Sequence, residues 1–328
     1  MRAWRTQGDG PENLRLDEMP IPVPSDTELL VRVVACGVCR TDLHIVDGDL
    51  PLRREPVVPG HEVVGVVDDV GAAVEAFVVG DRVGVAWLRS TCGSCRWCES
   101  GAENLCPNSR YTGWDDDGGY AEYTVVPAAF AYRVPDGIAD VDMAPLLCAG
   151  IIGFRSLQRA AVPPGGTLGI YGFGGSAHLT AQLAVSRGID VLVFTRDESA
   201  RSLALELGAS WAGESTDEPP VQLDSAIVFA PAGEVVPIAL AALDQQGTVA
   251  LAGIHMSDIP TLDYRRHLFG EKTLTSVTSN TRADGEEFLR QAEGVVRATA
   301  TPYPFERAPD ALRDLADGRV NGAAVLEL

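Results

Sequence analysis

The sequence predicts an α/β protein with two domains, first a β-rich domain and then a doubly wound parallel sheet. Three observations lead to this prediction. The chain has 328 residues, which suits two domains better than one. Its first 150 residues contain short β-branched segments separated by Gly, Pro and Asp. From about residue 151, strand-like and helix-like segments alternate, which is typical of a parallel sheet covered by helices.

The strands expected in the first region are short. They are ELLVRVVACGV, HEVVGVVDDVG, DRVGVAW and YAEYTVVP, which begin at residues 28, 61, 81 and 120. Strands of this length, separated by turns this frequent, indicate a small barrel or sandwich.

The second region predicts four buried strands, in TLGIYGFG, DVLVFT, SAIVFA and GTVALAGI. The helices expected between them are SAHLTAQLAVSRG, which ends at Gly188, SARSLALELGA and VVPIALAALD. The strands are continuous runs rich in Val, Ile and Leu, so both of their faces should be covered. After a further strand in TLTSVTS, we expect the helices DGEEFLRQAEGVV and APDALRDLADG and a closing strand, AAVLEL.

Charge and cysteine content argue against several classes of protein. The formal net charge of −20 disfavours nucleic acid and anionic membranes as partners, because both require basic patches. The segment MRAWRTQGDGPENLRL lacks the apolar region of a signal peptide, and no apolar stretch approaches eighteen residues. We therefore expect a cytoplasmic protein. In that reducing compartment, the seven cysteines are expected to be metal ligands or free thiols rather than disulfides.

Four cysteines lie close together in CGSCRWCESGAENLC, with the spacing C-x2-C-x2-C-x7-C. Four thiolates that can converge on one ion within fifteen residues predict a closed, tetrahedral zinc site. An iron–sulfur cluster or four unrelated buried thiols are the alternatives. A closed site leaves no open ligand position, so its expected role is to brace a loop. The predicted ligands are Cys92, Cys95, Cys98 and Cys106.

The segment YGFGGSAH follows a predicted strand and opens a predicted helix, which is the context that a dinucleotide-binding turn requires. Its glycines match G-x-G-x-x-G/A: the first allows a tight turn, the second lets the backbone approach a pyrophosphate, and the last small residue permits close helix packing. The pyrophosphate would sit at the N-terminus of the helix, where free N–H groups and the helix dipole favour an anion. The residues predicted to bind NAD(P)(H) here are Gly172, Phe173, Gly174, Gly175, Ser176 and Ala177.

The choice of cofactor depends on the end of the second strand, in VLVFTRDE. An NAD site usually has an acid there that binds the ribose hydroxyls, but this chain has Thr195 followed by Arg196. A missing acid beside an arginine is compatible with a 2′-phosphate, so the pattern slightly favours NADP. Asp197 and Glu198 come next and could repel a phosphate or bind the ribose themselves. Arg196 could also be a solvated loop charge, and NAD therefore remains an alternative.

Other cysteines and a histidine form a third group. ACGVCRTDLH contains Cys36 and Cys39, which could be a redox pair, half of a zinc knuckle, or one metal ligand beside a cysteine that binds nothing. PGHEVVG places His61 and Glu62 after a Pro-Gly turn, and APLLCAG places Cys148 near the junction of the two regions. With Cys39, these segments supply two thiolates and one imidazole, which is the Cys2His pattern of a catalytic zinc site with an open fourth position.

The chain resembles the zinc-dependent medium-chain alcohol dehydrogenases, for which the Cys2His pattern is known. GVCRTDLH, PGHE, CGSCRWCESGAENLC, LLCAG and YGFGGSAH occur in the family's order and spacing, and the resemblance covers essentially the whole chain. It implies a GroES-like β-rich catalytic domain, residues 1–151 and 278–328, and a Rossmann doubly wound parallel-sheet coenzyme domain, residues 152–277. It also implies an active site between the domains and assembly as a homodimer or homotetramer.

The resemblance further implies which residues bind metal. Cys39, His61 and Cys148 would hold one catalytic zinc ion per chain, besides one structural ion in the four-cysteine segment. Glu62 would be a transient ligand or would support the ligands. Asp42 would hydrogen-bond a ligand, most simply His61, and so fix its tautomer and orientation.

The proton path and the remaining contacts are implied in the same way. Thr41 would bond the substrate oxygen and begin a relay that reaches His44 through the nicotinamide ribose. Cys36 would be a small buried hydrophobe and not a ligand. Of the other histidines, His178 is expected to cap or pack in the cofactor helix, while His255 and His267 are expected in loops or at the surface. Arg40 and Arg282 would contact the cofactor pyrophosphate, and Trp87 and Trp114 would line the substrate pocket.

The implied reaction is reversible hydride transfer between a primary or secondary alcohol and a nicotinamide cofactor. Zinc with two thiolate ligands is a moderate Lewis acid that favours alkoxide over alcohol, and the protein supplies positioning and electrostatics. Many family members carry a Thr four residues after the third zinc ligand, near the nicotinamide, where this chain has Ile152. A polyol or amino-alcohol dehydrogenase of the same fold is an alternative, and a non-catalytic zinc and dinucleotide sensor is a further one.

Overall fold

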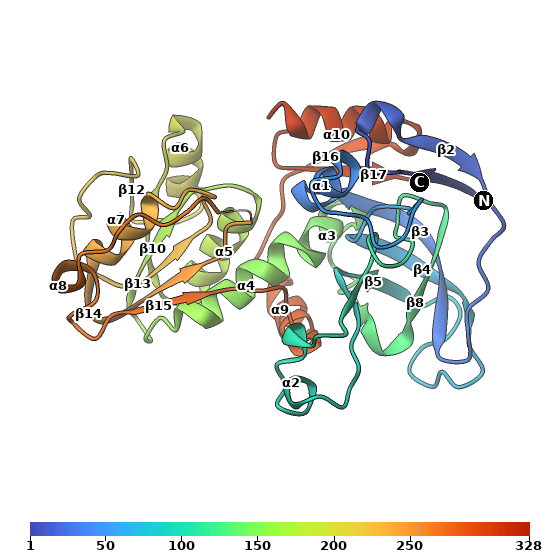
Figure 1. Cartoon of the computed structure of the whole chain (residues 1–328), viewed down its shortest axis with the longest axis horizontal. Coiled ribbons are helices and arrows are strands. Elements are labelled where there is room, and N and C mark those ends of the chain that lie inside the picture. Colours follow the sequence, from blue (N-terminus) through green and yellow to red (C-terminus); the bar gives the residue numbers. More distant parts are fainter. Residues whose placement is uncertain (255) are drawn as a thin grey trace. The chain divides into compact units, whose positions relative to one another are not determined.

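The computed structural model describes residues 1–254 and 256–328, which divide into two units (Figure 1). The first unit contains residues 1–148, 279–293 and 297–328. The second unit contains residues 149–278 and 294–296. The first unit is rich in β-strands and the second alternates strands with helices, as the sequence predicts.

A largely antiparallel sheet forms the framework of the first unit, and its strands run in the order β16-β17-β3-β4-β5-β9, with β8 paired to β3. Its longest strand, β3 (Glu28–Val38), pairs with β17 (Ala323–Glu327), so the last residues of the chain complete a sheet that the first region begins. The other strands of the sheet are β4 (Val63–Val70), β5 (Arg82–Val85), β8 (Tyr123–Pro127), β9 (Ala131–Arg133) and β16 (Ala300–Pro304). Two small antiparallel pairs join β1 (Arg2–Arg5) to β2 (Arg15–Glu18) and β6 (Leu88–Ser90) to β7 (Arg110–Tyr111).

Short helices lie around this sheet. The one that matters most for the site, α1 (Arg40–Asp47), begins directly after β3 and buries Leu43, Ile45 and Val46. The others are α2 (Arg96–Glu99), α3 (Asp140–Met143), α9 (Arg282–Ala292) and α10 (Ala308–Ala316). Single 3-10 turns occur at η1 (Pro11–Asn13), η2 (Glu103–Leu105), η3 (Ala128–Phe130), η4 (Ala144–Leu147) and η5 (Phe305–Arg307).

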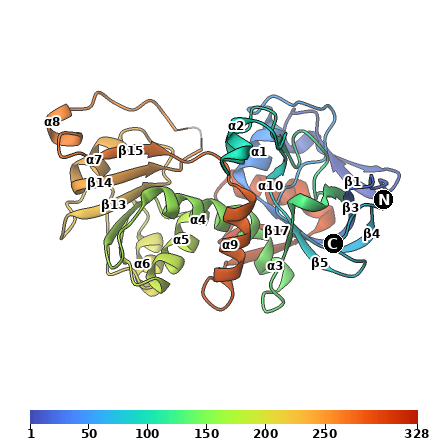
Figure 2. The ribbon, with the colours of Figure 1, turned by 90° about the horizontal axis from the view of Figure 1, so that it is seen from below.

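The second unit contains a parallel sheet with the strand order β12-β11-β10-β13-β14-β15. The order reverses at β10, and this reversal defines a doubly wound, Rossmann-type sheet and confirms the predicted fold class. Figure 2 shows α4, α5 and α6 on one face of the sheet and α7 on the other. The strands are β10 (Thr167–Tyr171), β11 (Asp190–Phe194), β12 (Trp211–Gly213), β13 (Leu223–Val228), β14 (Leu243–Leu251) and β15 (Thr273–Ser276). The helices are α4 (Ala149–Ala160), α5 (Gly175–Ser186), α6 (Glu198–Glu206), α7 (Val235–Ala242) and α8 (Tyr264–His267).

Sequence reasoning missed α4. Its sequence, AGIIGFRSLQRA, contains two glycines and a pair of β-branched residues, which are weak helix formers. Packing decides instead, because Ile151, Phe154 and Leu157 form a buried stripe at helical spacing. Gly153 lets α4 approach α5, where a Cβ would meet the hydroxyl of Thr180. Residues 1–254 and 256–328 contain no helix that is long and apolar enough to cross a membrane.

Candidate active site

The four clustered cysteines converge around α2 and η2. Their sulfur atoms lie 4.0 Å (Cys92–Cys98), 3.5 Å (Cys95–Cys98) and 3.5 Å (Cys92–Cys106) apart. In a tetrahedral site with Zn–S bonds of about 2.3 Å, neighbouring sulfur atoms lie about 3.8 Å apart. The four side chains also form one compact group of potential metal ligands. The donor set and its spacing therefore fit a closed zinc site.

One carboxylate anchors this lobe (residues 92–106) to the N-terminus of α9. Glu103 accepts hydrogen bonds from the backbone N–H of Arg282 at 2.8 Å and from its guanidinium Nε and Nη2 at 3.0 and 2.8 Å. Burial alone would raise the pKa of Glu103, but the hydrogen bonds from Arg282 hold the pKa below its usual value. The Arg282 side chain, which the sequence assigns to the cofactor pyrophosphate, thus has a protein partner that sequence reasoning did not foresee.

A second group of donors is assembled from three separate segments. Cys39 follows β3 and caps α1, His61 and Glu62 immediately precede β4, and Cys148 follows η4. One ligand atom from each of these four side chains lies within 4.8 Å of all the others. The Sγ of Cys39 is 3.3 Å from Nε2 of His61, and His61 is completely buried. Cys36 is also buried, on β3, and lies outside this group.

Asp42 orients the buried His61 by a hydrogen bond to its ring. Its Oδ1 accepts a hydrogen bond from His61 Nδ1–H at 2.9 Å and one from the backbone N–H of Gly60 at 3.1 Å, while Oδ2 accepts from the N–H of Cys39 at 2.9 Å. The structure therefore brings together the pair that the sequence proposes. Because Nδ1 is held by Asp42, Nε2 is the ring nitrogen that faces Cys39.

The two thiols of this group share one hydrogen bond. Cys39 accepts it from Cys148, which puts the pKa of Cys39 well below its ordinary value and that of Cys148 well above. Burial, and next to it the nearby Cys39, raise the pKa of Glu62. The imidazole and the carboxyl are buried and the two thiols are partly buried, so little water compensates their charge, and a divalent cation would do so.

Thr41 and His44 lie one turn apart on α1, which places them on the same face of the helix. The backbone N–H of Thr41 donates to Cys39 Sγ at 3.3 Å, so Thr41 lies next to the metal-ligand candidates. The Nδ1 of His44 is 3.0 Å from a carboxylate oxygen of Asp49, a residue that sequence reasoning missed. Arg40 is exposed at the start of the same helix.

Aromatic rings extend from the buried histidine. Trp87 packs edge-on against His61, with ring centroids 5.0 Å apart, and stacks on Tyr111 and Trp114 at 4.8 and 6.0 Å. At the far end, the guanidinium of Arg53 lies 3.9 Å from the ring centroid of Trp114. Sequence reasoning assigned both tryptophans to the pocket and missed Tyr111 and Arg53, whose proximity to the tryptophans comes from the fold.

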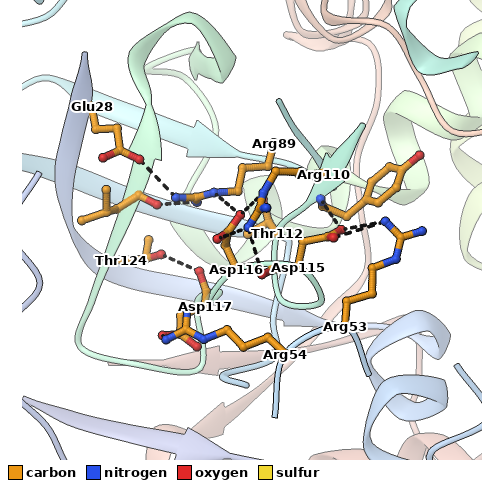
Figure 3. Close-up of polar contacts among 12 residues, drawn as sticks. Glu28, Arg53, Arg54, Arg89, Arg110, Thr112, Asp115, Asp116, Asp117 and Thr124 are labelled. Atoms are coloured by element: carbon orange, nitrogen blue, oxygen red, sulfur yellow. Dashed lines mark hydrogen bonds and ion pairs between the residues drawn. The ribbon is translucent and has the colours of Figure 1, made fainter. Parts of the chain in front are cut away.

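Ion pairs brace the turn that carries Trp114 (Figure 3). Arg89, nearly buried, lies 3.1 Å from Asp116 and 3.5 Å from Glu28, and burial lowers its pKa. Asp115 accepts from the N–H of Tyr111 at 2.9 Å and is paired with Arg53. Two further pairs are Arg110 with Asp116 and Arg54 with Asp117. This network holds the three rings in place.

The glycine-rich turn in the second unit is shaped for close backbone approach. Gly172 has a φ of 86°, and a Cβ there would crowd the backbone of Ala230. By contrast, a Cβ on Gly174 or Gly175 would meet nothing within 4 Å, so this stretch of backbone is open. The N-terminus of α5 has no side-chain cap, which leaves its N–H groups available to an anion. Phe173 and Ser176 are half-buried in the turn, and Ala177 is buried.

At the end of β11, Thr195 is nearly buried and Arg196 is exposed. A second arginine lies here: Arg201 donates from Nη1 to the carbonyl oxygens of Thr195 at 2.8 Å and Arg196 at 3.1 Å. Asp197 caps α6 and accepts from the N–H groups of Ser199 and Ala200. Sequence reasoning missed Arg201, although its position in the first turns of the following helix was a usable signal.

Four further residues that the sequence singles out are Ile152, His178, His255 and His267. Ile152 is half-buried in the first turn of α4. His178 packs in α5 with its Nδ1–H toward the carbonyl of Gly174, at 3.2 Å. The expectation of a surface position for His267 is wrong, because this residue is nearly buried and accepts a hydrogen bond from the N–H of Asp263. His255 lies outside the described residues.

Comparisons with known proteins agree with this geometry. The model of the alcohol dehydrogenase GroES-like domain matches residues 25–136. The chain is 57% identical over 335 residues to the probable alcohol dehydrogenase AdhA of Mycobacterium tuberculosis (strain CDC 1551 / Oshkosh), an alignment that covers 99% of this chain and 97% of that protein.

Two solved structures are similar over nearly their whole length. A cinnamyl alcohol dehydrogenase, SbCAD4, from Sorghum bicolor shares 30% identity with a TM-score of 0.90, covering 99% of this chain and 97% of that one. A cobalt- and zinc-bound thermostable alcohol dehydrogenase from Pyrobaculum aerophilum shares 27% identity with a TM-score of 0.91, covering 100% and 99%.

Proposed function

Because the chain belongs to the zinc medium-chain alcohol dehydrogenase family, we propose that Cys39, His61 and Cys148 bind a catalytic zinc ion on which turnover depends. The chain is an alcohol dehydrogenase, which transfers hydride reversibly between an alcohol and a nicotinamide cofactor. One observation carries the zinc proposal: donor atoms from three distant segments lie within 4.8 Å of one another. A donor set of two sulfurs, one imidazole nitrogen and a nearby carboxylate is the kind that zinc prefers.

When bound, zinc supplies Lewis-acid stabilisation of the negative charge that develops on the substrate oxygen. Asp42 keeps the hydrogen of His61 on Nδ1, so that Nε2 stays available as a ligand. Glu62 is buried beside the ligands and is proposed as a transient ligand or a support for them. Thr41 would bond the substrate hydroxyl, and His44 would accept the proton that leaves it.

We propose that the lobe of residues 92–106 binds one structural zinc ion. The sulfur–sulfur distances of 3.5–4.0 Å support this assignment. Four cysteine ligands leave no position for substrate, so the expected contribution is to the stability of the lobe and, through Glu103, to its attachment to α9.

For the cofactor, we propose NADP(H) ahead of NAD(H). Arg196 and Arg201 both lie at the end of β11, where the adenosine ribose of a dinucleotide sits in such folds. Asp197 is less available to a ribose, because its carboxylate is already used to cap α6. Replacing Arg201 with Ala should raise KM for NADPH about tenfold more than KM for NADH, and an equal change for both cofactors would contradict the assignment. Arg40 and Arg282 remain proposed pyrophosphate contacts.

For the substrate, the three stacked rings beside His61 favour a planar, apolar alcohol over a polyol. We propose an aromatic primary alcohol and its aldehyde. Replacing Trp114 with Ala should raise KM for benzaldehyde more than KM for acetaldehyde, because only the larger substrate can reach this ring. The polyol and amino-alcohol alternatives predict the opposite ranking of substrates.

We also propose a cytoplasmic location and a homodimer or homotetramer. None of the seven cysteines forms a disulfide, which matches a reducing compartment. The assembly is an expectation from the family, and light scattering after size-exclusion chromatography tests it.

The first experiment is the initial rate of benzaldehyde reduction, followed by nicotinamide absorbance, with NADH and NADPH in parallel and with and without a zinc chelator. Turnover that disappears on chelation supports the catalytic zinc, and the better cofactor tests the role of the two arginines. Cofactor binding without turnover across a wider panel of carbonyl compounds would instead favour the sensor.

A further inference from the structure

We propose that Asp49 is the positioning residue of the proton relay: its carboxylate holds the Nδ1–H of His44 and leaves Nε2 as the nitrogen that accepts the substrate proton. This inference rests on the proposed relay role of His44. It concerns a residue outside the metal-ligand groups and outside the cofactor turn.

The hydrogen bond itself defines the tautomer. Nδ1 of His44 lies 3.0 Å from Oδ2 of Asp49. A neutral imidazole has one donor and one acceptor nitrogen, while an ionised carboxylate can only accept. The hydrogen must therefore reside on Nδ1, and the lone pair on Nε2. In the other tautomer, two lone pairs would face each other and the ring could not accept a proton at Nε2.

The backbone turn after α1 fixes Asp49 in this position. Gly48 ends the helix in the left-handed conformation, with φ 80° and ψ 5°, and the N–H of Leu50 donates to the carbonyl oxygen of His44 at 3.0 Å. A Cβ on Gly48 would collide with the carbonyl oxygen of Gly8, so both conformation and space require glycine there. The side chain of Asp49 is thus directed back over the last turn of the helix by backbone contacts, although the carboxylate itself is largely exposed.

The same hydrogen bond sets the route of the proton through His44. Because Nδ1–H stays bonded to Asp49, the arriving proton binds at Nε2 and later leaves from there to water, while the hydride goes to the nicotinamide.

The chain thus uses the same device twice. Asp42 sets the tautomer of His61 from Nδ1, at 2.9 Å, so that Nε2 faces the metal-ligand group. Asp49 does the same to His44 at 3.0 Å, so that Nε2 serves the proton. The first pair is completely buried, whereas the second lies where a proton can be released to solvent.

The test uses the zinc-loaded enzyme and the variants Asp49→Ala, Asp49→Glu and His44→Gln, with Asp47→Asn as the matched control. The single-turnover rate of benzyl alcohol oxidation is measured with the better nicotinamide cofactor, because this rate is independent of product release. Asp49→Ala should lower it about tenfold, part of the 10²–10⁴-fold typical of positioned acid–base groups, with KM changed less than about twofold. Asp49→Glu should recover most of the rate, and Asp47→Asn should stay within about twofold of wild type.

A second readout reports the tautomer without turnover. In enzyme labelled with ¹⁵N-histidine, the His44 resonances are assigned from their absence in His44→Gln. The neutral ring should carry its hydrogen on Nδ1 in the wild type and should mix tautomers in Asp49→Ala. An unchanged tautomer, or a slow His44→Gln beside a fully active Asp49→Ala, overturns the role of Asp49 and leaves the relay intact. A His44→Gln enzyme as fast as wild type overturns the relay and the inference together.

Discussion

The two cysteine-containing groups of the first unit differ in how the chain builds them. The lobe group takes its four sulfurs from fifteen consecutive residues, and Cys92 at its edge is exposed. The second group takes its donors from residues 39, 61–62 and 148, its histidine and glutamate are buried, and Trp87 packs on the histidine. One site is therefore encoded by spacing along the chain, and the other exists only when β3, β4 and η4 are packed together.

This difference assigns different tasks to the two sites. A locally encoded site can brace only its own loop, whereas a site assembled by the core is held in place by buried partners such as Asp42. We therefore expect loss of the assembled site to abolish chemistry and loss of the lobe site to reduce stability. The following predictions are ordered from the largest expected effect to the smallest.

The largest effect is expected for Cys39→Ala. Removing one thiolate from the assembled site should release one zinc ion per chain and lower kcat for benzaldehyde reduction roughly 10³-fold or more, equivalent to about 4 kcal/mol of transition-state stabilisation. Metal content by atomic emission and initial rates check this result.

Cys36→Ala is the matched control, because this cysteine lies three residues away, is fully buried and is not in the ligand group. It should keep both zinc ions and at least a third of the activity, with about 1 kcal/mol lost from the stability of the core. Equal activity losses in the two variants would contradict the division of roles between the two cysteines.

The second-largest effect is expected for a ligand of the lobe site. Cys95→Ser should also release one zinc ion per chain, but kcat measured at 25 °C should stay within about threefold of wild type. The lobe loses its crosslink, so we expect about 3 kcal/mol less stability and a Tm roughly 6–10 °C lower. Calorimetry and zinc analysis measure this. The neighbouring exposed Ser94→Ala should change neither quantity, and a Cys95→Ser enzyme as inactive as Cys39→Ala would remove the distinction between the sites.

In the lobe, the four cysteine ligands could be predicted from the sequence, but the contact that attaches the lobe to α9 could not. The pattern C-x2-C-x2-C-x7-C already contains the four ligands, and the glycine-rich turn likewise contains its own strand-turn-helix context. Glu103 lies inside that same motif, yet its partner Arg282 is 179 residues away. Nothing local in the sequence distinguishes such an acid from a solvated one, because the contact depends on where the returning segment packs.

The third effect concerns the partner that orients His61. In Asp42→Asn, the amide oxygen can still accept from His61 Nδ1–H, but the negative charge is lost and the NH₂ group cannot accept from the N–H of Cys39. We expect zinc affinity at the assembled site, or activity, to fall 10- to 100-fold, roughly the effect typical of such supporting carboxylates. Competition with a chelator and initial rates measure the two quantities, and Asp47→Asn serves as the control on the same helix. Unchanged zinc affinity and rate would show that the assembled site does not need this partner.

The assembled site also shows what sequence reasoning can and cannot reach. Residue types and a family resemblance were sufficient to propose Cys39, His61, Cys148 and Asp42 as one group, and the structure brings them together. Asp49, Tyr111 and Arg53 were missed, because each acts on a named residue only through a turn or a stacked ring that the fold creates. Sequence reasoning missed α4 for a similar reason. Its residues are weak helix formers, and the packing of its buried stripe determines its structure.

The smallest effect tests whether the lobe depends on anchoring as well as on metal. Glu103→Gln keeps the shape of the side chain but replaces its charge-assisted hydrogen bonds to Arg282 with neutral ones, so we expect a loss of about 1–2 kcal/mol at pH 7 with both zinc ions retained. The pKa of Glu103 is depressed in the folded protein, so its stabilising effect is present above the pKa of the unfolded chain and is lost as the pH falls through the folded pKa. Denaturant unfolding should therefore show the wild type and Glu103→Gln converging between about pH 5 and pH 3. The exposed Glu99→Gln, in the same lobe, should match the wild type throughout. If Glu103→Gln does so as well, the metal alone holds the lobe.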